Sequence, residues 1–371
     1  MNYSTLDRFQ GAWLGSMIGS ALSNNLYKSD YNKVLNYKFQ HWVDIRNEIA
    51  EVAISSSSKS MLQTAEVSST GTITKCCLAA RQSRIIFEEA IQNLLENHFN
   101  NFLRYFSDIP NNFEQIPKAN LISYYCRSIS ALLPLIILQQ DNNRVCNLYI
   151  KTIAKYVSNL ALVESIQQDI ATWNCIVTMA LNNQFLFEES NVSLTSERIL
   201  NGIEAKSSSL VEKLNIVNQA WENGWSLKHL TTKLYRHESL TKETILTPGL
   251  AIALSFYCFA CTPRNFMLSV KRATKIDCNL SMPIALLTAT ISGAYNGRTS
   301  IPKNWLKAAG NCQPYQLAQK TVKRLYQNWL GVYDLDNLEL LCNLDGSKIA
   351  TPKIFQIRRN LNIVSQNYNS D

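Results

Sequence analysis

The side chains best suited to nucleophilic or metal chemistry in this chain are its ten cysteines, four histidines and 28 aspartates and glutamates. Cys258 and Cys261 have the Cys-x-x-Cys spacing of a zinc or redox site, but they lie in an apolar segment and no second pair has zinc spacing. We interpret them as buried structural thiols. The closest histidines, His229 and His237, are eight residues apart, which excludes a metal site built from neighbouring histidines. A Cys-His pair assembled in three dimensions stays open.

The acidic residues form no informative local motif either. The only Asp-x-Asp, at Asp334 and Asp336, favours the start of a helix over a metal site, because acidic side chains stabilise a helix N-terminus. Neither of the standard glycine-rich phosphate-binding patterns occurs. No motif of these kinds therefore predicts an activity by itself.

The elements that must position such residues are helices. Apolar residues recur at helical spacing along most of the chain and alternating runs are nearly absent, which predicts an all-α protein. Thr247 before Pro248, and Thr262 before Pro263, are expected to cap two helices. The expected helices cover residues 6–22, 76–106, 119–138, 145–162, 165–182, 209–224, 226–237, 248–261, 263–274, 283–296 and 315–330.

Two helical segments are rich in small residues. Gly11, Gly15 and Gly19 are four residues apart, so on a helix they make a smooth strip that another backbone or a ligand can approach closely. A second strip runs through Gly293 and Gly297. We expect the helices that carry the two strips to contact each other.

The charge and hydropathy of the chain exclude some classes of function. The net charge of +8 arises from 36 basic and 28 acidic residues that are scattered along the sequence, a pattern that does not indicate a nucleic-acid partner. No run approaches about 18 uncharged apolar residues, and residues 1–8 lack the features of a signal peptide. We expect a cytoplasmic protein without membrane insertion.

The two glycine strips resemble those of a known family. The segment from Asp7 to Ser23 resembles the first helix of the ADP-ribosylglycohydrolase family, and residues 293–306 resemble its last core helix and the segment that follows. Residues 131–135 and 256–273 are similar to elements between them. The resemblance implies a single all-α, orthogonal helical bundle of the ADP-ribosylglycohydrolase type. Its expected boundaries are 1–346 for the domain, 28–69 and 185–206 for irregular excursions, and 347–371 for a basic and apolar tail.

The resemblance also implies a dimetal site, and there the sequence departs from the family pattern. Such enzymes hold two divalent cations, usually magnesium or manganese, between an Asp-Asp-Thr motif and an Asp-x-Asp-Thr motif. A register without gaps places Leu280 and Met282 at the two aspartates of the second motif, and neither side chain can bind a hard cation. A register slipped by three residues would bring Asp277 and Asn279 into place. The first motif is missing, because the chain has no adjacent aspartates.

Other positions of the implied ligand cleft change as well. Ser20 stands where the family has an aspartate, and Tyr125, Cys126 and Arg127 replace a Gly-Asn-Gly beside the bound ribose. Bulky side chains in place of glycines would fill a cleft. We take the following residues as a vestigial cleft: Gly19, Ser20, Arg127, Asp277, Asn279, Leu280 and Met282.

These losses lead to a functional hypothesis and one alternative. We expect a non-catalytic binding or scaffolding protein with a protein partner, no cofactor, no catalytic residues and no dimetal hydrolysis. The alternative is an active ADP-ribosyl hydrolase, or a binder of an ADP-ribose-type ligand, that uses noncanonical groups such as Asp277 and Asn279 with magnesium or manganese.

Overall fold

The computed structural model describes residues 3–24, 46–51, 118–139, 160–185, 209–240, 249–276, 280–310 and 313–330. Regular structure in these ranges is entirely helical, so the all-α prediction is confirmed. The elements are α1 (Thr5–Asn24), α4 (Lys118–Ala131), α5 (Leu133–Gln139), α7 (Leu160–Leu181), α9 (Ser209–Glu222), α10 (Leu227–Leu240), α11 (Gly249–Ala260), α12 (Phe266–Thr274), α13 (Ser281–Asn296), the 3₁₀ turn η2 (Arg298–Ser300), α14 (Lys303–Gly310) and α15 (Gln313–Leu330). The expected helix at 76–106, most of that at 145–162, Thr247 and the tail at 347–371 lie outside the described residues.

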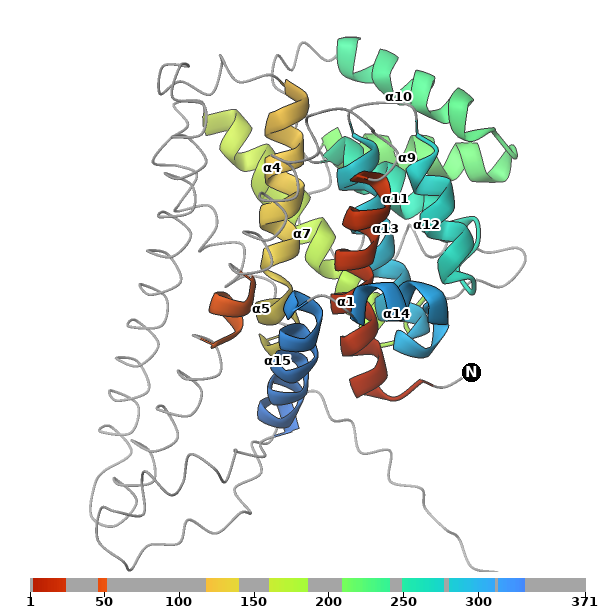
Figure 1. The fold of residues 1–371 in the computed structure, drawn as a ribbon. Helices are drawn as coiled ribbons and strands as arrows, with labels where there is room; N and C mark the ends of the chain where they lie inside the picture. The colour runs from red at the N-terminus through yellow and green to blue at the C-terminus, as the bar shows by residue number, and fades with distance from the viewer. Residues whose placement is uncertain are drawn as a thin grey trace, which may run out of the picture.

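Two helices at the centre of the molecule, α1 and α13, run side by side (Figure 1). All residues of α13 except Tyr295 are buried, as expected for a helix that is apolar or small-sided all round. The three glycines of α1 face α13 one after another. Gly11 faces Gly293, Gly15 faces the alanine at 289, and Gly19 faces the alanine at 285. The expected contact between the two small-residue strips is therefore confirmed.

The remaining helices surround this pair. Helices α4, α7, α11 and α12 pack against α13, α15 packs against α1, and α10 lies on α9 at the upper rim of the view in Figure 1. Phe9 of α1 makes edge-to-face ring contacts with Tyr326 and Trp329 of α15, with centroids 5.9 and 5.6 Å apart. None of the described helices combines the length and apolar character that a membrane span requires.

One predicted helix cap is wrong. Helix α12 begins at Phe266 and is capped by Asn265, whose Oδ1 accepts a hydrogen bond from the Leu268 amide at 3.0 Å. Thr262, the expected cap, instead accepts a hydrogen bond from Arg272 Nη1 at 3.0 Å. Pro263 consequently lies in the turn before the helix and not in its first turn.

The structure also differs from the prediction in where several helices begin and end. The expected helix at 119–138 breaks at Leu132, because Pro134 has no amide hydrogen to donate and its ring clashes with the backbone carbonyl four residues earlier. Helix α7 runs without interruption from residue 160, where the sequence suggested a break between 162 and 165. Helix α14 was not predicted, since only its first residues were recognised as a proline-led segment.

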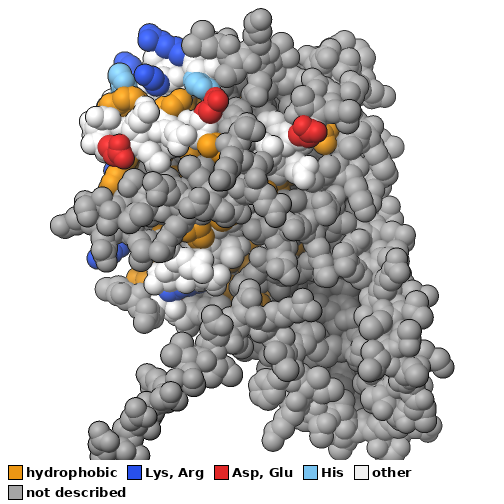
Figure 2. Space-filling model, turned by 180° about the vertical axis from the view of Figure 1, so that it is seen from behind, with side chains coloured by type: hydrophobic (Ala, Val, Ile, Leu, Met, Phe, Trp, Pro, Cys, Tyr) orange, Lys and Arg blue, Asp and Glu red, His pale blue; other side chains and the backbone are white. Residues whose placement is uncertain are grey.

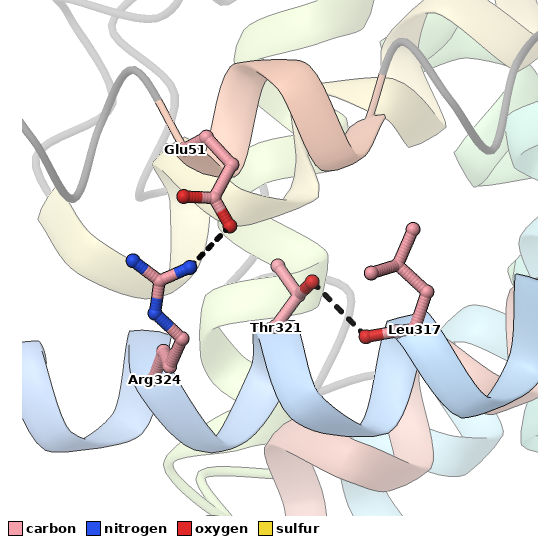
Figure 3. A network of polar contacts seen from close by, with 4 residues as sticks. All are labelled: Glu51, Leu317, Thr321 and Arg324. Atoms are coloured by element: carbon pink, nitrogen blue, oxygen red, sulfur yellow. Dashed lines mark hydrogen bonds and ion pairs between the residues drawn. The ribbon is translucent and has the colours of Figure 1, made fainter.

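A short helix at residues 46–51 lies inside the stretch that was expected to be irregular. Ile49 and Ala50 are fully buried in the core. Glu51 forms an ion pair with Arg324 of α15, whose Nη1 donates to the Glu51 Oε1 at 2.6 Å (Figure 3). Part of the region 28–69 is therefore a packed element of the domain.

Candidate functional site

The described members of the vestigial cleft come from three helices. Gly19 and Ser20 lie near the end of α1, Arg127 lies on α4, and Leu280 and Met282 lie at the start of α13. Gly19 faces Ala285, about one turn after Met282, and Arg127 contacts Met282 directly. The fold thus gathers these residues around the first turns of α13. Asp277 and Asn279 lie outside the described residues.

The contact between Arg127 and Met282 is unusual for a buried cation. Arg127 is only 6% exposed, and its Nη2 donates to the Met282 Sδ at 3.7 Å, a weak acceptor. Its Nε is buried without an acceptor. Burial lowers the pKa of Arg127 to about 10, an effect that the neighbouring Cys126 opposes. The guanidinium is therefore still charged at neutral pH.

The first turn of α13 offers no oxygen ligands of the type that the family pattern requires. Leu280 is the N-cap residue and makes no side-chain capping bond, and no acidic residue lies in the first turn. Leu280 is 3% exposed and Met282 is 8% exposed. An aliphatic side chain, a thioether and a guanidinium do not fit two hard divalent cations, because such cations need oxygen ligands and the guanidinium repels them. In the part of the chain that the structure describes, no group of three His, Cys, Asp or Glu side chains could hold a metal ion.

A buried carboxylate that no sequence motif indicated lies near this region. Asp169 of α7 is 1% exposed and accepts a hydrogen bond from the Gly249 amide at 2.7 Å, at the first residue of α11. A carboxylate at this position accepts a hydrogen bond from an amide that has no acceptor within the helix. Its negative charge is also stabilised by the partial positive charge at the helix N-terminus. Burial and, next, the charge of Asp169 raise the pKa of the Cys126 thiol. An acid inside the apolar run of α7 is the signal that could have identified it.

Other buried cations were also missed. Arg46 donates to the Ser16 Oγ and lies 4.6 Å from the Trp13 ring centroid, and burial lowers its pKa to about 9. Arg8 donates to the Leu181 carbonyl at 2.9 Å. Unlike Arg127, each of these arginines donates to an oxygen atom of the protein.

The outer face of α10 is basic. Lys228, Lys233 and Arg236 are exposed on it, and Figure 2 shows Lys, Arg and His side chains gathered at the top of the face that it presents. The ring of Trp225 lies 4.7 Å from that of His229 and 5.5 Å from the Lys233 Nζ. Basic and aromatic side chains thus lie together on α10 and just before it.

The sequence model of the family described as ADP-ribosylglycohydrolase matches residues 1–333. No match to the chain was found among curated proteins. The matched range includes both glycine strips, the buried cluster at the start of α13 and all of the described helices. The chain therefore belongs to the ADP-ribosylglycohydrolase family.

Proposed function

We propose that this protein is a non-catalytic member of its family, which binds a partner or ligand in the cytoplasm and does not hydrolyse ADP-ribosyl bonds. The observation that carries the proposal is the buried contact between Arg127 and Met282 at the start of α13. In the ungapped register with the family pattern, this is the place where carboxylates hold the metal ions.

The chemistry of hydrolysis explains why this contact matters. A metal-activated water requires cations held by oxygen ligands, because the ions lower the pKa of the water and stabilise the developing charge. Leu280 and Met282 supply no such ligands, and the positive charge of Arg127 raises the energy of a cation beside it. Without these ligands the metal ions are not held, so no metal-activated water forms and the reaction is lost, not merely slowed.

The alternative is a metal-dependent hydrolase that uses Asp277 and Asn279. A specific metal site stabilises the folded state by mass action, so thermal melting separates the two proposals. We expect millimolar magnesium or manganese to raise the melting temperature no more than sodium chloride at equal ionic strength. A saturable shift that disappears in Asp277→Ala, and persists in the exposed control Glu164→Ala, would favour the alternative.

We further propose that the partner is a protein with an acidic segment. The basic face of α10 supports this proposal, because complementary charge promotes association and orients the partners. The test is capture from native lysate with the full chain and with Lys228→Glu/Lys233→Glu. A bound protein should be lost in this variant and at high salt. Equal capture by the native chain and the variant would show that the partner binds a surface other than α10.

A further inference from the structure

The N-terminal end of α13 is electrostatically positive. The first amide groups of any helix lack acceptors within it, and their aligned dipoles give this end a partial positive charge. In α13 the donors at this end are the amides of Ser281 and Met282, because Pro283 has no amide hydrogen and Ile284 donates to the Leu280 carbonyl. The N-cap Leu280 makes no side-chain capping bond, and the first turn contains no acid that would offset the positive charge. The helix is 16 residues long, so it is long enough for its dipole to act on a bound anion.

Arg127 adds a second, independent positive group at the same place. Its guanidinium is buried, contacts the side chain of the second residue of α13, and leaves Nε without an acceptor. No described Asp or Glu forms an ion pair with it. A buried cation without a counter-charge is unfavourable, and an anion from outside the chain would relieve the cost.

We propose that Arg127 and the first turn of α13 form a binding site for a phosphate group. This inference deepens the proposed non-catalytic function and rests on it. The place where the family pattern puts carboxylates to hold cations would, in this chain, receive an anion. The charge of the site changes from negative in the family pattern to positive in this chain, because one arginine is present and two acids are missing.

The geometry suggests how the phosphate enters. Met282 covers the guanidinium, and a methionine side chain has three rotatable bonds and adapts easily to a new neighbour. The phosphate oxygens replace the thioether sulfur as acceptors of the Arg127 Nη2 and also reach Nε, because a guanidinium presents its donors as a planar fork. The phosphate can come from inorganic phosphate or from the diphosphate of an ADP-ribose-type ligand.

The test is calorimetric binding and thermal melting of the full chain with inorganic phosphate and, separately, with ADP-ribose, against chloride at equal ionic strength. We expect saturable binding to the native chain, and binding weakened at least about tenfold in Arg127→Met, which loses a charge-assisted bidentate contact. Arg46→Met is the matched control, since Arg46 is equally buried but donates to Ser16 on α1. It should bind like the native chain.

Met282→Ala provides a second test that keeps Arg127 in place. It removes the covering thioether, so phosphate should bind more tightly than to the native chain. Tighter binding of ADP-ribose than of inorganic phosphate would identify the nucleoside diphosphate as the source, and equal binding would identify free phosphate. The inference is overturned by no saturable response beyond chloride, or by equal binding to Arg127→Met and the native chain. A failed proposed function would instead show metal-dependent turnover, which these binding measurements do not report.

Discussion

Gly11 of α1 and Gly293 of α13 face each other so closely that a Cβ atom on either residue would overlap the backbone carbonyl oxygen of the other. The same close approach recurs at Gly15 and Gly19, which face the backbone of α13 one and two turns away. The two central helices thus touch backbone to backbone, and their spacing fixes the position of the first turn of α13 relative to α1.

Gly293→Ala should therefore destabilise the fold strongly. The new methyl group meets rigid backbone and not a flexible side chain, so we expect a loss of at least about 3 kcal/mol in the free energy of unfolding, at the upper end of overpacking effects. The control is Gly224→Ala, where φ is 60° and no atom lies within 4 Å. It should cost only about 1–2 kcal/mol, from backbone strain alone. Denaturant unfolding measures both, and equal losses would mean that the helices can separate without penalty.

Asp169→Asn should weaken the link between α7 and α11. The substitution removes the charge that strengthens the bond to the Gly249 amide, and hydrogen bonds to charged groups contribute about 1.5–3 kcal/mol. Because the amide oxygen of asparagine still accepts this bond, we expect the free energy of unfolding to decrease by about 1 kcal/mol, the difference between a charged and a neutral hydrogen bond. Glu164→Gln on the exposed side of α7 is the control and should change stability by less than about 0.5 kcal/mol. If Asp169→Asn left the free energy of unfolding unchanged, the charge of the carboxylate would not contribute to stability.

The ion pair between Glu51 and Arg324 should contribute little (Figure 3). The two side chains are 48% and 36% exposed, and pairs of this kind are worth about 0.2–1 kcal/mol and are screened by salt. A double-mutant cycle with Glu51→Gln and Arg324→Met should give a coupling energy in that range at low salt and a smaller one at high salt. Coupling above about 2 kcal/mol would show that the pair is the main anchor of residues 46–51.

Much of the fold could be predicted from the sequence, because apolar periodicity and small-residue spacing are local signals. The strips at Gly11 and Gly293 predicted a helix contact that the structure confirms. The cap of α12 could not be predicted in this way, because Thr262 has a tertiary partner in Arg272. The buried helix at 46–51 was missed for the same reason: its packing depends on distant residues, not on its own short pattern.

For the candidate site, the sequence could predict only which residues of the family pattern are missing. The sequence indicates that Leu280 and Met282 replace acids, but not that Arg127 lies against Met282, since the two are 155 residues apart. Asp169 is a similar case, because its partner Gly249 is 80 residues away. Pairings of this kind depend on how helices pack, and spacing along one helix does not encode them.

Restoring acids at the start of α13 should affect the two positions differently. Met282→Asp places a carboxylate beside the buried guanidinium of Arg127, whereas Leu280→Asp has no described cation as a partner. Leu280 is the N-cap residue of α13, so a carboxylate there can accept from the amides of the first turn, which offsets part of the penalty of about 3–5 kcal/mol for an unpaired buried charge. We expect Leu280→Asp still to cost more than Met282→Asp, whose carboxylate meets a full positive charge. In the Arg127→Met background the cost of Met282→Asp should rise. If it does not, the two side chains do not interact.

The release of ADP-ribose from modified protein tests the central claim most directly. The native chain should release none above the uncatalysed background with magnesium, with manganese or with a chelator, and Leu280→Asp/Met282→Asp should also release none, because the Asp-Asp-Thr motif is still missing. A family member with both metal motifs intact serves as the positive control. Turnover by the native chain that the chelator abolishes would contradict the account.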